Sequence, residues 1–151
     1  IGEATYGPDH PTVAIRVNNL GLVLKALGDL AGAKAAYERA IKIDEAAYGL
    51  DHPNVAIDVN NLGNVLKNLG DLVGAKVALE RAITIWEANL GPDHPQVATG
   101  VNNLGLVLQA LGDLAGAKAA CERALKIFET FLPPDHPTLR LVRDNLQSLQ
   151  E

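Results

Sequence analysis

The stretch that decides the fold runs from Gly7 to Tyr48 and reads GPDHPTVAIRVNNLGLVLKALGDLAGAKAAYERAIKIDEAAY. The same pattern returns along the chain with a constant step of 42 residues. The string Asp-His-Pro shows this step most clearly, because it begins at Asp9, Asp51, Asp93 and Asp135. Self-similarity at a fixed period of about 20 to 50 residues is typical of repeat architectures. We therefore expect an array of one repeated structural unit.

The step divides the 151 residues into three full repeats, which are residues 7–48, 49–90 and 91–132. Residues 1–6 align with 43–48 and are expected to be the tail of a preceding repeat. Residues 133–151 carry the pattern of a first helix only, and a polar capping helix is what the exposed end of a solenoid requires. Because the chain starts inside a repeat and contains no methionine, we expect it to belong to a longer multidomain protein with domains N-terminal to residue 1.

Each repeat is predicted to form two antiparallel helices. The first helix has an apolar stripe with steps of four and three residues, formed by Val13, Val17, Leu20, Leu24 and Leu27. The second helix has a stripe of its own, formed by Leu30, Ala33, Ala36, Tyr37, Ala40 and Ile43. A core of small and aliphatic side chains, with only 4% aromatic residues, suits packed helices better than a sheet. The predicted fold class is all-α, an α-solenoid of antiparallel helix pairs.

Short polar segments and glycines mark where these helices begin, end and touch. Asp9 is expected to cap the first helix. Gly28 can adopt the left-handed conformation that ends it, and Asp29 is expected to cap the second helix. Gly21 lies inside the first helix, where a glycine costs about 1 kcal/mol relative to alanine. Its return in every repeat predicts a close helix approach, and we expect Gly21 to face Ala33.

The composition limits the class of function. The formal net charge is −5 and Lys and Arg do not cluster, so we expect no nucleic-acid partner. The longest apolar runs fall far short of the roughly 20 residues that span a bilayer, so we expect no membrane partner either. The single cysteine, Cys121, excludes an intramolecular disulfide and fits a reducing compartment. The expected location is the cytoplasm.

Several of these residues carry a family resemblance. The spacing of Leu20, Gly21, Gly28, Ala33 and Tyr37 resembles the tetratricopeptide repeat, and the added Gly-x-Asp-His-Pro segment resembles the 42-residue form found in kinesin light chains. The near identity of the first and third repeats resembles duplicated arrays in bacterial regulatory proteins. The resemblance implies a superhelix in which the first helix of each repeat lines a concave groove, and it implies protein binding.

A second stripe on the first helices lies roughly opposite the core stripe and is expected to face this groove. We call it the groove stripe, and it consists of Ile15, Asn18, Leu22, Lys25, Ile57, Asn60, Asn64, Lys67, Thr99, Asn102, Leu106 and Gln109. Its apolar members Ile15, Leu22, Ile57 and Leu106 are expected to be exposed there, and exposed apolar groups gathered in a concavity indicate a binding site.

The asparagines at the same position of each repeat are expected to contact the backbone of a bound peptide. Asn18, Asn60 and Asn102 both donate and accept hydrogen bonds, as peptide groups do, and in kinesin light chains the corresponding residues contact cargo peptides. The alternative is that they bond only water or a neighbouring repeat. Asn61 and its counterparts point further round the helix and are expected to brace adjacent repeats.

Catalytic and metal-binding chemistry is not expected. The four Asp-His pairs occupy equivalent places in different repeats, too far apart to share a metal ion whose ligands lie at about 2 Å. Cys121 takes an aromatic position of the repeat and is interpreted as a core thiol. The sequence also has no phosphate-binding loop or nucleophile elbow. We expect no cofactor, no metal and no enzyme activity.

The sequence thus predicts a non-catalytic interaction module that binds a peptide or a helical segment of a partner protein. Lys25 and Lys67 indicate a mild preference for acidic peptides. The alternative is a structural spacer or a self-association element of a larger signalling protein.

Overall fold

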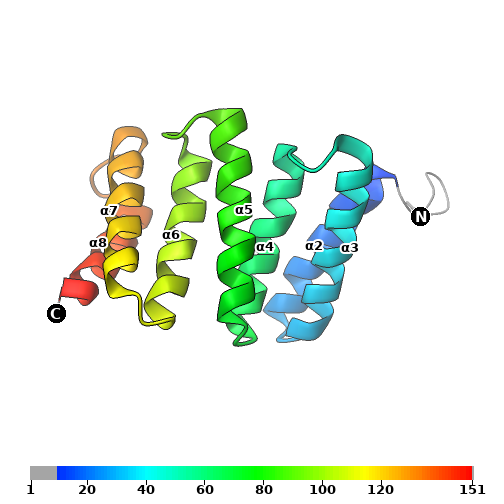
Figure 1. The fold of residues 1–151 in the computed structure, drawn as a ribbon, viewed down its shortest axis with the longest axis horizontal. Helices are drawn as coiled ribbons and strands as arrows, with labels where there is room; N and C mark the ends of the chain where they lie inside the picture. The colour runs from blue at the N-terminus through cyan, green and yellow to red at the C-terminus, as the bar shows by residue number, and fades with distance from the viewer. Residues whose placement is uncertain (1–9, 151) are drawn as a thin grey trace. The chain divides into compact units, whose positions relative to one another are not determined.

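The computed structural model describes residues 10–150, and every regular element in that range is an α-helix (Figure 1). The helices are α2 (Pro11–Ala26), α3 (Leu30–Tyr48), α4 (Pro53–Asn68), α5 (Leu72–Leu90), α6 (Pro95–Ala110), α7 (Leu114–Phe131) and α8 (Pro137–Gln150). The predicted repeat tail at residues 1–6 and the predicted cap at Asp9 lie outside the described residues. Consecutive helices pack as antiparallel pairs, so the all-α solenoid class is confirmed.

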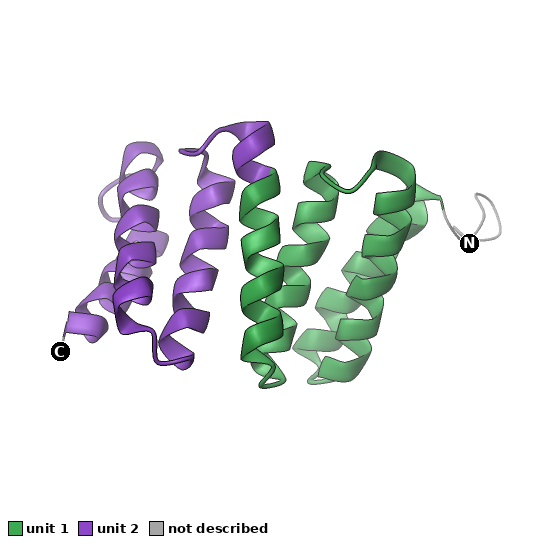
Figure 2. Cartoon of the chain, in the orientation of Figure 1, with its two compact units in different colours: residues 1–85 green, residues 86–151 purple. Residues whose placement is uncertain are grey.

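The chain forms two compact units that divide within α5 (Figure 2). The first unit, residues 1–85, contains α2, α3, α4 and most of α5. In it α2 packs on α3 and α3 packs on α4. The second unit, residues 86–151, contains α6, α7 and α8, and here α6 packs on α7 and α7 on α8.

A histidine caps each first helix, which corrects the prediction that aspartate does so. Nδ1 of His10 accepts a hydrogen bond from the backbone N–H of Thr12 at 3.1 Å. The same bond recurs at His52, His94 and His136, with lengths of 3.1, 3.0 and 3.0 Å. The reason is positional: proline occupies the first helical residue, so the residue directly before it is the N-cap. Histidine Nδ1 is attached to Cγ, as the side-chain oxygen of a capping Asn is, and it serves as the same kind of acceptor.

The turn between the two helices of a repeat is built as predicted. Gly28 has φ +88°, and its N–H donates to the carbonyl of Lys25 at 3.0 Å, while the N–H of Asp29 donates to the carbonyl of Leu24 at 2.8 Å. This pair of bonds is a Schellman motif. Oδ1 of Asp29 then accepts from the N–H of Gly32 at 2.9 Å and caps α3. A Cβ at position 32 would collide with the Asp29 carboxylate, which explains the glycine there.

The core stripe predicted for α2 is confirmed in the N-terminal half of the helix, whereas two of its C-terminal members are exposed. Val13 and Val17 are buried with Ala36, Ala40 and Ile43 of α3. Leu20 and Leu27, in contrast, are 50% and 76% exposed. Leu27 is the C-cap residue, beyond the last helical turn. Leu20 corresponds to Leu62 of α4, which packs against the preceding α3, and no helix of the described range precedes α2.

The glycine inside each first helix marks a close helix approach, and only at Gly21 are the nearest atoms all from a residue other than the expected alanine, since the carbonyls of Ala75 and Ala117 lie against Gly63 and Gly105. A Cβ at Gly21 would lie 2.6 Å from the ring of Tyr37, one turn beyond Ala33. A Cβ at Gly63 would lie 2.8 Å from Leu79. In the second unit the space is less tight, because a Cβ at Gly105 would lie 3.3 Å or more from its neighbours in α7.

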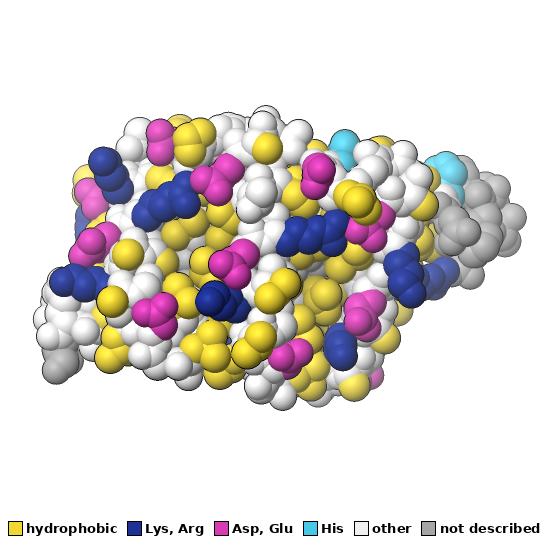
Figure 3. Space-filling model, viewed as in Figure 1, with side chains coloured by type: hydrophobic (Ala, Val, Ile, Leu, Met, Phe, Trp, Pro, Cys, Tyr) yellow, Lys and Arg dark blue, Asp and Glu magenta, His cyan; other side chains and the backbone are white. Residues whose placement is uncertain are grey.

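An arginine of each of two second helices forms a link to the preceding repeat that the sequence analysis did not identify. Nη2 of Arg81 bonds Oε2 of Glu45 at 2.6 Å and the carbonyl of Leu50 at 3.0 Å. In the second unit, Nη2 of Arg123 bonds Glu87 at 2.9 Å and the carbonyl of Pro92 at 3.2 Å. Acidic and basic side chains lie interspersed on the face drawn in Figure 3. These pairs are partly exposed, so each contributes at most about 1 kcal/mol.

The two glycine environments predict responses of different size to the same substitution. Gly21→Ala is expected to lower the free energy of unfolding by about 1 to 3 kcal/mol, because the new methyl group overlaps the Tyr37 ring. Gly105→Ala is expected to change it by less than about 1 kcal/mol, since the tighter packing is offset by a gain in helix propensity. Urea unfolding followed by circular dichroism measures both, and equal losses would contradict the assigned contacts.

Candidate peptide-binding site

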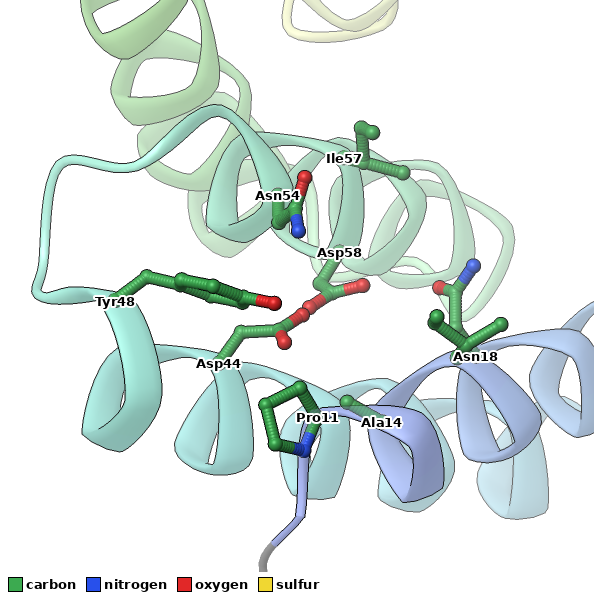
Figure 4. Close-up of a pocket in the computed structure, with 9 residues that line it drawn as sticks. Pro11, Ala14, Asn18, Asp44, Tyr48, Asn54, Ile57 and Asp58 are labelled. Carbon is green, nitrogen blue, oxygen red and sulfur yellow. The ribbon is translucent and has the colours of Figure 1, made fainter.

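A pocket of about 210 Å³ opens between the first two repeats of the first unit (Figure 4). We call it the acidic pocket, and it is lined by Pro11, Ala14, Ile15 and Asn18 of α2, Asp44 and Tyr48 of α3, and Asn54, Ile57 and Asp58 of α4. It brings together three members of the predicted groove stripe, Ile15, Asn18 and Ile57. Residues from two consecutive first helices therefore meet at one concavity.

Two buried carboxyl groups face each other in this pocket. Asp44 of α3 and Asp58 of α4 point toward one another (Figure 4). Asp44 is only 6% exposed and Asp58 only 3%. Oδ2 of Asp58 is buried without a hydrogen-bond donor. A carboxylate removed from water without donors is costly, and a second negative charge beside it adds to the cost.

The protonation of Asp58 follows from these surroundings. Burial, and then the hydrogen bond and the negative charge of Asp44, raise the pKa of Asp58 to about 9. At neutral pH the Asp58 carboxyl therefore keeps a proton. The nearby Tyr37 hydroxyl is buried without a partner, and burial together with the charge of Asp58 raises the pKa of Tyr37.

The open side of the pocket is shaped by the loop between α3 and α4. The Tyr48 ring stacks on His52 with centroids 4.3 Å apart, and His52 caps α4 through the N–H of Asn54. The Tyr48 hydroxyl points toward the two carboxyl groups (Figure 4). The helix cap thus also holds an aromatic wall of the pocket.

The apolar groove-stripe residues of the first unit are open to solvent. Ile15, Leu22 and Ile57 are all exposed. The polar members Lys25, Asn64 and Lys67 are half-buried. Exposed β-branched side chains at the mouth of a pocket are available for contact with an apolar group of a partner.

Two asparagines of the first unit, Asn18 and Asn61, contact each other between repeats. Nδ2 of Asn61 donates to Oδ1 of Asn18 at 3.1 Å, so Asn61 braces adjacent repeats as expected. The same bond uses one lone pair of Asn18, whose amide N–H groups are still able to donate. Asn60 is 8% exposed and buried. Asn60 therefore offers little surface for direct contact with a peptide.

In the second unit the groove-stripe residues are less exposed than expected. Thr99, Asn102, Leu106 and Gln109 are all half-buried, which corrects the expectation that Leu106 is exposed. The Thr99 hydroxyl donates to the carbonyl of Pro95 at 3.2 Å, within its own helix. Oδ1 of Asn102 is buried and accepts no hydrogen bond.

The sequence analysis missed the residues that give the pocket its charge. Asp44, Tyr48, Asn54 and Asp58 are not in the groove stripe, because two of them belong to the second helix and two lie on another side of α4. A signal was present in the departures from the repeat. The counterparts of Asp44 are Trp86 and Phe128, so an acidic residue at an otherwise aromatic position marks the site.

Other reactive groups in the described residues have simpler roles. A second pocket, of about 360 Å³, is lined by Asp93, Arg123, Lys126, Ile127, Thr130 and Phe131 of the second unit. Within residues 10–150 no group of three metal-ligating side chains comes together. Cys121 is buried in the core as interpreted, and burial raises the pKa of its thiol. No helix in that part of the chain is long and apolar enough to cross a membrane.

Helix pairs repeated at 42 residues, with a fixed turn and a fixed glycine contact, define a helical-repeat protein. The tetratricopeptide repeat family model matches residues 13–72 and 56–130. The chain therefore belongs to the tetratricopeptide repeat family, whose members are interaction modules that act as non-catalytic scaffolds. A search of curated proteins finds no match.

Solved structures show the same fold. The chain is 26% identical to BtubC (BKLC) from P. vanneervenii, with a TM-score of 0.83, over 92% of this chain and 56% of that one. It is 21% identical to a putative kinesin light chain from Podosopora anserina with nearly identical repeats, with a TM-score of 0.85, over 93% and 66%. The first tetratricopeptide domain of Spaghetti (RPAP3), bound to the HSP90 peptide SRMEEVD, is 17% identical with a TM-score of 0.65, over 91% and 94%. The chain thus spans between about half and two thirds of the first two structures.

The raised pKa of Asp58 predicts that stability falls as the pH rises. The folded carboxyl keeps its proton up to about pH 9, whereas an unfolded aspartate loses it near pH 4. Between these values the folded state binds more protons, so the free energy of unfolding decreases with pH by up to about 1.4 kcal/mol per unit. Asp58→Asn removes this slope and is expected to be more stable than the parent near pH 8, with the difference shrinking toward pH 5.

Urea unfolding of both proteins at several pH values measures this difference. Glu38→Gln, which neutralises an exposed carboxylate on α3, is the matched control and should follow the parent. A parallel pH dependence in Asp58→Asn and the parent would contradict the assignment.

Proposed function

We propose that this chain binds a peptide or a helical segment of a partner protein on the first helices of its repeats, α2, α4 and α6. The observation that carries the proposal is the acidic pocket, which joins Ile15 and Asn18 of α2 to Ile57 of α4 at the junction of two repeats. Such a pocket receives one side chain of a bound segment, and the exposed isoleucines beside it contact its neighbours. The three full repeats at residues 7–48, 49–90 and 91–132 form the proposed module.

The chemistry of the surface supports this reading. Exposed Ile15, Leu22 and Ile57 offer apolar contact, and the Asn18 amide has donors to spare for a peptide carbonyl. An extended peptide advances about 3.3 Å per residue, so packed helices about 10 Å apart would meet one in three of its residues. The similar RPAP3 domain is bound to a peptide, which supports the same mode of action here.

A peptide-display selection against the whole chain tests the proposal. Random peptides displayed on phage are selected on the parent protein, and the dissociation constants of the enriched peptides are measured by fluorescence anisotropy. Ile15→Ser combined with Ile57→Ser is expected to weaken binding at least about tenfold, because about 0.8 kcal/mol is lost for each buried methylene-sized group. The matched control is Val73→Ser with Val77→Ser, which removes two exposed β-branched residues from α5.

The two variants separate the possible outcomes. Loss of affinity in the Ile15/Ile57 variant and retention in the Val73/Val77 variant supports binding on the first helices. Equal affinity in the Ile15/Ile57 variant and the parent would show that the peptide binds on another surface. A selection that enriches no peptide would contradict peptide binding.

Self-association is a second candidate that one observation favours. Leu20, Val23 and Leu27 form an uncovered apolar stripe on α2, where they are 50%, 53% and 76% exposed. Val65 of α4, the counterpart of Val23, is completely buried in the cluster that contains Ala33 and Tyr37 of α3, and Leu62, the counterpart of Leu20, is partly buried against it. The equivalent surface of α4 is covered by α3, so the α2 stripe is suited to packing against a helix similar to α3.

Analytical ultracentrifugation checks the second candidate. If a second copy covers the stripe, the parent should dimerise at tens of micromolar, and Val23→Asp should be a monomer at the same concentration because it buries a charge at the contact. A parent that stays monomeric over this range would exclude the stripe as a strong self-association surface.

A further inference from the structure

The acidic pocket holds two buried carboxyl groups and no balancing positive charge. None of the residues that line it is basic, and Oδ2 of Asp58 reaches no donor although the side chain is 97% removed from solvent. The amides of Asn18 and Asn54 and the hydroxyl of Tyr48 are the other polar groups of the lining. Two carboxyl groups this close are held together only when one of them carries a proton or when a cation lies against them.

The fold itself does not require carboxyl groups at these positions. The residues that correspond to Asp44 in the next repeats are Trp86 and Phe128, and those that correspond to Asp58 are Gly100 and Val142. All four are buried. The second unit therefore fills the equivalent junctions with apolar groups, which cost nothing to bury. A carboxyl pair kept at an energetic cost at one junction needs a different explanation.

The walls of the pocket suit the stem of a long basic side chain. Ala14, Ile15 and Ile57 provide apolar surface around the mouth, and the Tyr48 ring stands beside the carboxyl groups (Figure 4). Lysine and arginine have apolar methylene stems below their charged ends, and their cations also interact with aromatic faces. The volume, about 210 Å³, is that of a site for one side chain rather than for a drug-sized molecule.

We propose that the acidic pocket receives a lysine or arginine side chain of the bound partner segment, whose cation lies against Asp44 and Asp58. The inference rests on the proposed peptide-binding function and adds a specificity to it. It also differs from the sequence-based expectation, in which Lys25 and Lys67 favour acidic peptides. A partner segment with a basic residue at the pocket and acidic residues beyond it satisfies both.

Binding of the cation is linked to release of a proton. The proton on the Asp58 carboxyl must leave for the ammonium or guanidinium group to lie against two carboxylates. The titratable groups facing Asp58 are Asp44, Tyr37 and Tyr48, all from α3, and the residues that α2 contributes to the pocket do not titrate. The affinity should therefore rise with pH, by up to about tenfold per unit below the pKa of Asp58.

The experiment repeats the phage selection on three proteins in parallel. One is the parent, the second is Asp44→Asn with Asp58→Asn, and the third is Glu38→Gln with Glu80→Gln. The third variant replaces the same number of carboxyl groups by amides, at exposed positions of α3 and α5. Circular dichroism first verifies that the variants are folded. The expected result is a fixed Lys or Arg position in peptides selected by the parent and by the third protein, absent from those selected by the second.

The outcomes distinguish this inference from the function on which it rests. Enriched peptides without a basic position, or with the same basic position in all three selections, overturn the pocket assignment and leave peptide binding intact. No enrichment on the parent overturns peptide binding itself.

A measurement on the parent alone covers the case in which the double variant does not fold. One selected peptide is compared with its analogue in which norleucine replaces the basic residue. The analogue should bind at least about tenfold more weakly, and only the basic peptide should gain affinity between about pH 6.5 and pH 8.5. Equal affinities, or equal pH dependence, would overturn the inference.

Discussion

The structure depends on the turn that joins the two helices of a repeat. Gly28 ends α2 with a positive φ, Asp29 begins α3 with its carboxylate, and Gly32 leaves room for that carboxylate. The same bonds return at Gly70 and Asp71, and at Gly112 and Asp113. A turn this short leaves the helices antiparallel, so their apolar sides must pack on one another. The helix contact at Gly21 and the stacking of further repeats follow from that arrangement.

Much of the fold could be predicted from the sequence because the repeat supplies the same evidence several times. The patterns that predict helices, turns and the buried positions of the second helix recur every 42 residues. A pattern that arose by chance in one repeat would therefore be absent from the next. The exceptions have local causes. Leu20 and Leu27 have the right periodicity but lie where no described helix covers them or beyond the helix end. The sequence analysis gives the capping role to aspartate rather than to histidine, because residue propensity alone does not determine which residue directly precedes the first helical turn.

The candidate site was only partly predictable, because two of its main residues depart from the repeat pattern. Ile15, Asn18 and Ile57 were found because they repeat a pattern, whereas Asp44 and Asp58 break it. A buried carboxyl pair requires two residues from different helices to meet, and only the three-dimensional structure establishes that meeting. The charge, the raised pKa and the absence of a donor at Asp58 are properties of the pair, not of either residue in the sequence.

The position of the acidic pocket has a consequence for how such an array changes over evolutionary time. Asp44 belongs to the repeat at residues 7–48 and Asp58 to the repeat at 49–90, so copying either repeat alone copies half of the carboxyl pair. The second of these repeats is joined to the first by Arg81, whose guanidinium bonds Glu45. An array can therefore lengthen by duplicating one repeat while the pocket stays unique. The smallest heritable piece that carries the whole pocket runs from Pro11 to Asp58, a stretch that crosses a repeat boundary and is longer than one 42-residue repeat.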